Sequence, residues 1–347
     1  MFDSKTVDLI RSYSNKIETL GELPKEVLDV IYDKKLFKLY VPEELGGNMV
    51  SFPEAIKAFE DAAWVDGSFG WLVQIGSGAG FFVTTMELEW AREVFSQHHV
   101  YIAGSDRASG VAKKVDGGFI VSGEWKFCSG SKNATVFTAN AQIKNEGMTR
   151  AFTFTPDQVD IIEDWDAFGL KGTNSHTIRV EEAFVPDYKT FDVLKPHFHF
   201  DDPIYHYPFL PFAAANIAAT TIGIARHFFE EANAHVQQKK ELWNQYEPGR
   251  FDQVLGKINK MEQPFIDEVE KFHQAIERSW NKHVNGQPIS EDDLIDIQDL
   301  CKSVAEHAVH GAQVIFRYLG MAAIMESSHL NRIYRDLLTA SQHKLLI

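Results

Sequence analysis

Residues 123–130 read GEWKFCSG, and this short stretch indicates the architecture of the middle of the chain. The residues at alternate positions from Phe119 to Phe127 are Phe, Val, Gly, Trp and Phe, a period of two that is typical of a strand with one buried face. A turn signal, Asp116-Gly117-Gly118, stands before this run, and a shorter apolar run stands before the turn. The pattern predicts a β-hairpin whose second arm runs from Phe119 to Cys128.

Several more short strands surround this hairpin. Runs rich in β-branched and aromatic residues are bounded by Gly, Pro, Asn and Asp, as strands usually are. They lie at Val100–Ala103, Ala134–Ile143, Arg150–Thr155 and Thr177–Val185. Strands of this length and spacing predict a small barrel or sandwich.

Helical patterns occupy the two flanks of the chain. Near the N-terminus, Ser51-Phe52-Pro53-Glu54 predicts a capping box at the start of an apolar stripe. In the second half the apolar period is helical over Phe212–Lys240, Phe251–Val284, Asp292–Leu319 and Glu326–Leu338. We therefore expect a mainly α protein with a central β domain, divided into residues 1–98, 99–190 and 191–347.

Composition narrows the class of protein. Lys and Arg number 34 against 49 Asp and Glu, which gives a net charge of −15, and an acidic surface repels nucleic acids and anionic membranes. Only Cys128 and Cys301 are cysteines, too few for a disulfide framework and consistent with a reducing compartment. The N-terminus lacks the pattern of a secretory signal, and no apolar run is long enough to span a bilayer, so we expect a cytoplasmic protein.

A family resemblance emerges from motifs that follow one another in order along nearly the whole chain. They are VPEELGG at 41–47, DGS at 66–68, GEWKFCSG at 123–130, GLKGTNSHT at 169–177 and YRD at 334–336. Together they resemble flavoproteins with the acyl-CoA dehydrogenase fold, and most closely its two-component flavin-dependent monooxygenase branch. The resemblance implies an N-terminal helical domain, a β barrel or sandwich, a C-terminal four-helix bundle and a homotetramer.

The resemblance also implies a flavin site at the end of the hairpin. Phe127 then covers an edge of the flavin ring, and Ser129 places its hydroxyl near the flavin N5 atom. We expect the cofactor to be bound by Trp125, Phe127, Cys128, Ser129, Thr173, Ser175, His176 and Arg335. An alternative interpretation stays open for His176, because a polar residue on a surface loop would look the same in the sequence.

The chain departs from the dehydrogenases at its C-terminal end. Residues 335–347 read RDLLTASQHKLLI, and no Asp or Glu follows Asp336, whereas a dehydrogenase needs a carboxylate base in that stretch. His343 stands there instead, and imidazole can act as acid or base near neutral pH. We predict that His343 is the acid–base catalyst, with Ser129 as the second catalytic residue. The alternative is that His343 belongs to a frayed terminus.

The segments with which dehydrogenases hold the FAD pyrophosphate are altered in this chain. Residues 242–251 read LWNQYEPGRF and 316–320 read FRYLG, and neither matches the family pattern. The cofactor is therefore FAD or FMN, bound loosely as reduced flavin. We find no nicotinamide-binding fingerprint, so the electrons would come from a separate flavin reductase.

The loop between the β domain and the bundle is rich in aromatic residues and histidine. The resemblance places this loop, residues 195–212, at the substrate entrance, so Tyr205, His206 and Phe209 are candidate substrate contacts. Its histidines have no recognisable metal-ligand spacing, and we predict no metal site. The expected activity is oxygenation of a small aromatic substrate. Two alternatives are an acyl-CoA dehydrogenase and a non-catalytic flavin-binding scaffold.

Overall fold

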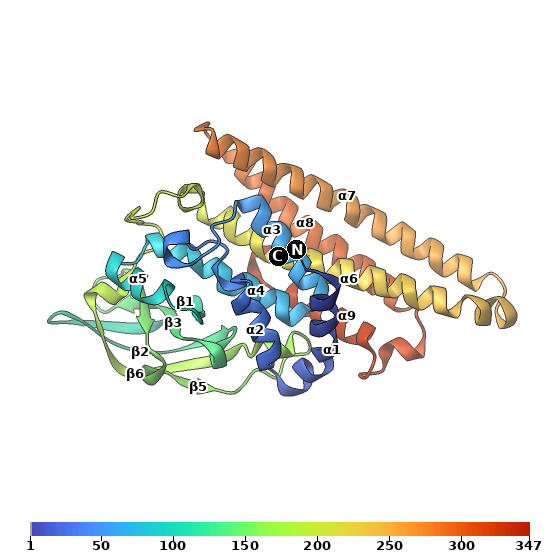
Figure 1. Cartoon of the computed structure of the whole chain (residues 1–347), viewed down its shortest axis with the longest axis horizontal. Coiled ribbons are helices and arrows are strands. Elements are labelled where there is room, and N and C mark those ends of the chain that lie inside the picture. Colours follow the sequence, from blue (N-terminus) through green and yellow to red (C-terminus); the bar gives the residue numbers. More distant parts are fainter. Residues whose placement is uncertain (1) are drawn as a thin grey trace.

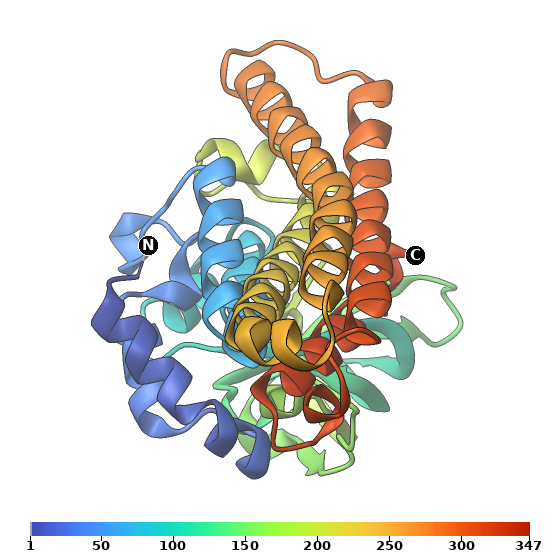
Figure 2. The same cartoon turned by 90° about the vertical axis from the view of Figure 1, so that its right-hand side faces the viewer.

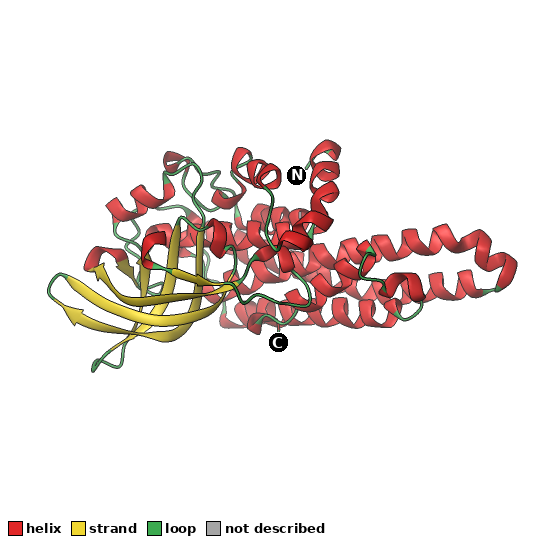
Figure 3. Cartoon of the chain, turned by 90° about the horizontal axis from the view of Figure 1, so that it is seen from below, coloured by secondary structure: helices red, strands yellow, loops and turns green. Residues whose placement is uncertain are grey.

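The structure, a computed structural model, describes residues 2–347 and has a β domain at one end with long helices extending away from it (Figures 1 and 3). The N-terminal helices are α1 (Ser4–Leu20), α2 (Lys25–Asp33), α3 (Phe52–Val65), α4 (Gly67–Gly78) and α5 (Leu88–Phe95). The C-terminal helices are α6 (Phe209–Tyr246), α7 (Arg250–Val284), α8 (Glu291–Phe316) and α9 (His329–Ala340). This arrangement confirms the predicted fold class, mainly α with a central β domain.

Local signals explain where several helices begin. The predicted capping box forms at α3, where Glu54 Oε2 accepts hydrogen bonds from the Ser51 backbone N at 2.9 Å and from Ser51 Oγ at 2.6 Å. Ser290 and Asp293 form a second box at α8, with Ser290 N donating to Asp293 Oδ2 at 3.0 Å. These reciprocal bonds satisfy backbone N–H groups that the first helical turn leaves without partners.

The strands form one mixed sheet of seven strands in the order β5-β6-β2-β1-β3-β4-β7. Their bounds are β1 (Ile102–Val115), β2 (Gly118–Cys128), β3 (Val136–Ile143), β4 (Thr149–Phe154), β5 (Asp160–Ile162), β6 (His176–Pro186) and β7 (Thr190–Phe191). The predicted hairpin is confirmed, because β1 and β2 pair antiparallel up to Val115 opposite Gly118. The end of the run predicted as a strand at Val100–Ala103 and the short run before the turn, residues 111–115, belong to one long strand that begins at Ile102. Its register shifts between Ser105 and Gly110.

The sheet curls so that distant strands share one core. The rings of Phe119 on β2 and Phe152 on β4 lie 5.3 Å apart, and those of Trp125 and Phe154 lie 6.0 Å apart. Trp125 has no exposed surface, and its Nε1 donates to the Asn140 carbonyl at 2.8 Å. The single curled sheet therefore provides the enclosed core that we expected of a barrel or sandwich.

Two glycines make room for the Trp125 indole. A Cβ added at Gly110 would lie 2.2 Å from Trp125 Cζ2, and one at Gly123 would lie 2.7 Å from Trp125 Cη2. Both contacts are far closer than van der Waals distance, so neither position accepts a side chain while the indole is there. The first glycine of GEWKFCSG, Gly123, is thus explained by Trp125, two residues later.

The alternation predicted for the second arm of the hairpin is wrong at its end. A register shift between Trp125 and Cys128 interrupts the pairing of β2 with β6, and Phe127 adopts a left-handed backbone with φ of +67°. As a result Trp125 is fully buried, whereas Phe127 is 55% exposed. An extra residue in one strand turns side chains to the other face, and this turn brings Phe127 out of the core.

The C-terminal helices pack on one another along their length (Figures 1 and 2). Helices α7 and α8 form an antiparallel pair that lies against α6, and α3 packs on the first half of α6. Helix α6 is long and apolar enough to cross a membrane by composition alone, but 78% of its most apolar window is buried inside the protein. It is accordingly the core helix that joins the N-terminal helices to the bundle.

Helix α4 lies where the three parts of the chain meet. It contacts α3, α6, α9, β1 and the loop that precedes β6. Asp66 caps its first turn by accepting from the Phe69 backbone N at 3.1 Å, and Ser14 of α1 donates to the same carboxylate at 2.7 Å. The side chains of α4 therefore reach the β domain and the C-terminal segment at once, which makes this helix central to the site.

Candidate active site

A chain of hydroxyl groups lies at the end of β2. The Oγ atoms of Ser129 and Ser175 are 2.8 Å apart, and Thr173 Oγ1 lies 2.7 Å from Ser175 Oγ. Thr173 Oγ1 donates to the Leu170 carbonyl at 2.8 Å, and Trp71 Nε1 of α4 donates to Ser129 Oγ at 3.0 Å. Three of the residues predicted from the two motifs are thus brought together by hydrogen bonds.

The loop before β6 is tied firmly to the strand end. Gly130 N donates to the Thr173 carbonyl at 2.8 Å, and Ser131 Oγ donates to the Asn174 carbonyl at 2.9 Å. Leu170 and Asn174 both have positive φ, of +51° and +36°, a conformation that costs free energy in residues other than glycine. The bonds to the strand end hold the loop in this strained shape.

Tyr101 packs against the backbone of Ser129 and Gly130 at the end of β2. Its hydroxyl donates to the Ser129 carbonyl at 3.0 Å, and its ring would overlap a Cβ added at Gly130, at 2.3 Å. Gly130 also has a φ of +75°, which favours glycine. The close approach of ring and backbone fixes the direction in which Ser129 leaves the strand.

His343 contacts the same Trp71 indole that donates to the hydroxyl chain. The rings of Trp71 and His343 are 6.1 Å apart at an interplanar angle of 61°, an edge contact. Nδ1 of His343 accepts from the Leu345 backbone N at 3.3 Å, which leaves Nε2 as the ring nitrogen without a partner among residues 2–347. Burial lowers the pKa of His343, Asp106 nearby raises it, and Lys344 lowers it. The imidazole is therefore biased towards its neutral form.

The C-terminal tail that carries His343 is docked. Leu346 is 5% exposed and packs against the hydrophobic core, and Lys344 forms an ion pair with Asp106 at the surface. The segment also contacts α6 and α8. Termini are poorly ordered unless they are tied down, and Leu346 ties this one down. The arrangement favours a positioned histidine over a frayed end.

Arg335 and Asp336, at the end of the chain before the tail, contact the loop that precedes β6 and carries Thr173 and Ser175. Leu170 N donates to Asp336 Oδ1 at 2.5 Å, and a Cβ added at Gly169 would lie 2.2 Å from the Arg335 carbonyl. Burial raises the pKa of Asp336 to about 7, with a further contribution from the nearby Asp66 carboxylate. Helix α9 is thereby joined to the strand-end loop, and His343 follows three residues after that helix ends.

Phe127 and His176 lie beside the chain of hydroxyls. Arg107 stacks over the Phe127 ring at 5.5 Å, and the Trp165 ring meets its edge at 6.3 Å. His176 Nδ1 accepts from the Trp165 backbone N at 3.1 Å, and burial lowers the pKa of His176. Phe127 is available to cover a flat ligand, whereas the Nδ1 atom of His176 already serves a structural bond.

Three residues predicted to bind the cofactor are engaged elsewhere. Trp125 is enclosed in the β-domain core, and Cys128 is fully buried beside it, with burial raising the pKa of its thiol to about 12. Arg335 donates to Asn331 at 2.7 Å, to the Phe168 carbonyl at 2.7 Å and to Glu18 at 2.5 Å. Burial of the first two side chains and the three protein bonds of Arg335 favour structural roles for these side chains, and their binding of cofactor stays a prediction.

The three residues predicted to contact substrate differ in their surroundings. Tyr205 is 2% exposed and donates to the Tyr40 carbonyl at 2.7 Å, so its hydroxyl is not free. His206 faces away from the core, pairs with Asp201 at 2.9 Å and stacks on Phe198. Phe209 is partly buried and its ring lies 5.3 Å from that of Phe81, just after α4. Of the three, Phe209 is the one whose ring packs against a residue that follows α4, and all three substrate contacts stay predictions.

Sequence reasoning missed two residues of α4. Trp71 contacts both Ser129 and His343, and Gln74, one turn further along, is 4% exposed but its Oε1 atom has no hydrogen-bond partner in the described chain. Ile75 and Gly78, which follow at helical spacing, are only partly buried. A buried amide oxygen without a partner is uncommon. The sequence alone carries no signal for Gln74, because its meaning depends on what surrounds it.

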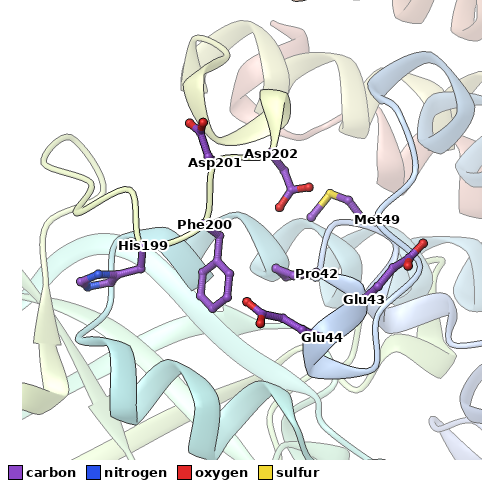
Figure 4. A pocket seen from close by; sticks show the side chains of 8 residues that line it. All are labelled: Pro42, Glu43, Glu44, Met49, His199, Phe200, Asp201 and Asp202. Atoms are coloured by element: carbon purple, nitrogen blue, oxygen red, sulfur yellow. The ribbon is translucent and has the colours of Figure 1, made fainter.

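A separate cavity of about 440 Å³ lies between the loop after α2 and the loop before α6 (Figure 4). Its lining is strongly acidic: Pro42, Glu43, Glu44, Met49, His199, Phe200, Asp201 and Asp202. Burial raises the pKa of Asp202, and the neighbouring carboxylates raise it further. Such a lining repels an anionic cofactor. In the described part of the chain, no cluster of three or more His, Cys, Asp or Glu side chains has the geometry of a metal site.

Comparison with known proteins assigns the class. The acyl-CoA dehydrogenase N-terminal domain matches residues 7–87, and the acyl-CoA dehydrogenase C-terminal domain matches residues 215–346. Together the two matches cover more than half of the chain, on both sides of the β domain. The chain belongs to the acyl-CoA dehydrogenase family.

Proteins similar to this chain include a monooxygenase and a hydroxylase. Indole-3-acetate monooxygenase of Pseudomonas putida is 27% identical over 346 residues, which is 97% of this chain and 87% of that protein. The 3-HSA hydroxylase of Rhodococcus sp. RHA1 has the same fold, with a TM-score of 0.86 at 20% identity over 99% of this chain and 91% of that one. XiaF from Streptomyces sp., solved with FADH2 and glycerol, gives a TM-score of 0.86 at 18% identity over 99% and 89%.

Proposed function

We propose that this chain is the oxygenase component of a flavin-dependent monooxygenase, which takes reduced flavin from a separate reductase and hydroxylates a small aromatic substrate. The observation that carries the proposal is the position of His343. Its ring contacts the Trp71 indole, which donates to Ser129, and it stands in the segment where a dehydrogenase needs a carboxylate. Similarity to indole-3-acetate monooxygenase over almost the whole chain supports the same activity.

The strand end has the properties that a flavin requires. Phe127 is an exposed aromatic ring beside the hydroxyl chain, and Ser129 Oγ has one hydrogen-bonding position left after its bonds to Trp71 and Ser175. In the proposed complex Phe127 covers the ring system and Ser129 binds its polar edge, with Thr173 and Ser175 behind Ser129. When bound, reduced flavin supplies the two electrons that divide O2 between hydroxylated product and water.

His343 is the proposed acid–base group. Its lowered pKa keeps the imidazole neutral at physiological pH. Because Nδ1 accepts the Leu345 N–H, the hydrogen of the neutral ring lies on Nε2, which presents a donor to a bound ligand. The ring takes up a proton when the weak 3.3 Å bond to Leu345 opens and frees Nδ1. Nε2 carries no bond within the protein, and Nδ1 is held by the Leu345 backbone. A held ring with one outward N–H is suited to donating a hydrogen bond at a defined position.

The substrate is proposed to bind against the side of α4 that carries Gln74 and Gly78. Phe209 supplies an apolar surface next to the end of this helix, and Gln74 supplies an amide whose oxygen has no partner in the protein. An aromatic ring with one polar substituent would satisfy both features. This combination supports small aromatic alcohols, acids and indoles over long acyl chains.

The dehydrogenase alternative lacks its base. Asp106 is the carboxylate beside His343, but it is 65% exposed and paired with Lys344, so it is well solvated. Removing a proton next to a thioester carbonyl requires a carboxylate whose pKa is raised by desolvation. Asp336 has such a pKa, yet it is bonded to Leu170 within the loop.

A two-stage experiment tests the proposed function. Purified protein is titrated anaerobically with reduced FMN and reduced FAD, and oxygen is then admitted in the presence of indole-3-acetate or simple phenols. We expect binding of at least one reduced flavin and a hydroxylated product detected by mass spectrometry. Bleaching of bound oxidised flavin by acyl-CoA thioesters would instead establish a dehydrogenase. Flavin binding without any product would favour the non-catalytic flavin-binding scaffold, and the absence of any flavin binding would contradict the proposed function.

The assembly and location of the protein are also proposals. Met321, Ile324 and Met325 are exposed apolar residues on one short segment after α8, which supports an interface between copies of the chain. A homotetramer is the arrangement that the family resemblance implies, and sedimentation analysis measures it directly.

A cytoplasmic location is a further part of the proposal. Both cysteines are buried and free, which is usual for proteins of a reducing compartment.

A further inference from the structure

The hydroxyl chain at the strand end has a fixed direction. A carbonyl oxygen can only accept and an indole N–H can only donate, so the Leu170 carbonyl and Trp71 define its two ends. At 2.8 Å the Thr173 hydroxyl must point its hydrogen at the Leu170 carbonyl, since two bare oxygens would repel each other at that distance.

The remaining hydrogens follow from the fact that each hydroxyl has only one. Thr173 has used its hydrogen, so the contact of 2.7 Å with Ser175 needs the Ser175 hydrogen. Ser175 can then only accept in its contact of 2.8 Å with Ser129, which needs the Ser129 hydrogen. Ser129 Oγ therefore accepts from Trp71, donates to Ser175, and retains one lone pair and no hydrogen.

We infer that Thr173 and Ser175 are positioning residues that make the strand end selective for the reduced state of flavin. The inference rests on the proposed function. The N5 atom of reduced flavin carries a hydrogen and donates, whereas N5 of oxidised flavin has no hydrogen and accepts. A Ser129 oxygen that can only accept forms a hydrogen bond with the first and meets the second with two lone pairs facing each other.

This selectivity would serve a protein that obtains its flavin from a reductase. Reduced flavin would be retained on arrival, and oxidised flavin would be released after turnover. Ser129, Thr173 and Ser175 are all buried, at 6%, 0% and 4% exposure, so water cannot easily reverse the direction of the chain. The property depends on the loop, because Leu170, Thr173 and Ser175 all lie in it.

The test compares the dissociation constants of oxidised and reduced flavin for the wild-type protein and two variants. Ser175→Ala removes the acceptor of the Ser129 hydrogen, and Thr173→Val removes the donor to Leu170 so that the chain can reverse. In either variant Ser129 becomes able to donate to oxidised flavin. We expect the preference for reduced flavin to fall by about two- to tenfold, the range of one hydrogen bond, and the bound-flavin potential to fall by about 30 mV for a tenfold change.

Ser131→Ala is the matched control. Ser131 is also a buried serine that ties the strand end to the loop, through its bond of 2.9 Å to the Asn174 carbonyl, but it lies outside the chain. It should leave the ratio of the two dissociation constants unchanged. An unchanged ratio in both chain variants, or a wild-type protein that binds the two states equally, would overturn the inference. If the wild-type protein binds neither state, the proposed function itself fails.

Discussion

The two sides of the site are held in different ways. On the strand-end side, Ser129, Thr173 and Ser175 are linked by consecutive hydrogen bonds and the loop is tied to β2 through Gly130. On the tail side, His343 is positioned by an edge contact with Trp71 and by the burial of Leu346. The first side is stabilised by many bonds between buried groups, and the second by a small apolar anchor close to the chain end.

This difference indicates which side can move. Opening the strand end would expose several buried polar groups at once, each of which costs free energy when it loses its partner. Undocking the tail would expose Leu346 and break one surface ion pair, which contributes little. We expect local opening of the site to begin at the tail, and the following four predictions test that expectation from the largest effect to the smallest.

His343→Ala should give the largest effect. Loss of the acid–base group should lower the rate of hydroxylation by about 100-fold or more, with hydrogen peroxide released in place of product. Thermal unfolding should be nearly unchanged, because the ring is only partly buried and lies near the chain end. Product and peroxide are measured together, with His310→Ala as a control on an exposed histidine of α8. Native rates in His343→Ala would remove this residue from the mechanism.

Leu346→Ala should weaken the docking of the tail. Leu346 is 5% exposed, whereas the adjacent Ile347 is 72% exposed, so Ile347→Ala is a control of similar size in the same segment. Loss of a buried leucine costs about 2–5 kcal/mol in a core, and the tail should therefore spend much of its time undocked. We expect roughly tenfold slower hydroxylation and faster C-terminal proteolysis for Leu346→Ala alone. Equal behaviour of the two variants would show that the anchor lies elsewhere.

Asp336→Asn should change how stability depends on pH. Burial raises the pKa of Asp336 to about 7 from an ordinary value of 3.8, so the folded protein favours the neutral carboxyl. Its stabilising contribution is complete below pH 4 and is lost as the pH rises through 7. Asn cannot ionise and can still accept from Leu170 N. We expect urea denaturation to show similar stability at pH 5 and a variant that is more stable at pH 8, by an amount on the order of 1 kcal/mol. A variant less stable at both values would contradict the raised pKa.

Gln74→Leu should produce the smallest change, with opposite effects on stability and substrate binding. Replacing a buried amide that has no partner for its oxygen should raise the free energy of unfolding by up to about 1 kcal/mol. If the amide binds the polar group of the substrate, KM should rise several-fold while flavin affinity stays constant. Calorimetry and steady-state kinetics measure the two effects. An unchanged KM would place Gln74 outside the substrate site.

Much of the fold was predictable because its signals are local. The hairpin, the capping box at Ser51 and the long helices of the bundle each follow from a period or a cap in the sequence. The strands β5 and β7, of 3 and 2 residues, were not predicted, because a period of two cannot be recognised over so few positions. The left-handed backbone of Phe127 also escaped, since the sequence favours continued alternation and only the pairing with β6 imposes the bulge.

The site was predictable only where a motif carries it. Ser129, Thr173 and Ser175 come from two motifs that resemble a known family, and the structure joins them. Trp71 and Gln74 carry no motif, because their importance depends on which residues face one side of α4 in space. Arg335 shows the converse, since a family motif does not say whether a residue binds ligand or, as Arg335 does with Asn331 and Glu18, binds the protein itself.

The fit between Trp125 and the two glycines beside it limits the order in which this sequence can change. A side chain at Gly110 or Gly123 would overlap the indole, so neither position can accept one until Trp125 has been replaced. Replacing Trp125 first would leave a cavity in the β domain that costs about 3–5 kcal/mol. Every single-step route therefore passes through a poorly stable protein. The three positions are expected to persist or to be exchanged together among descendants, although none of them touches a substrate.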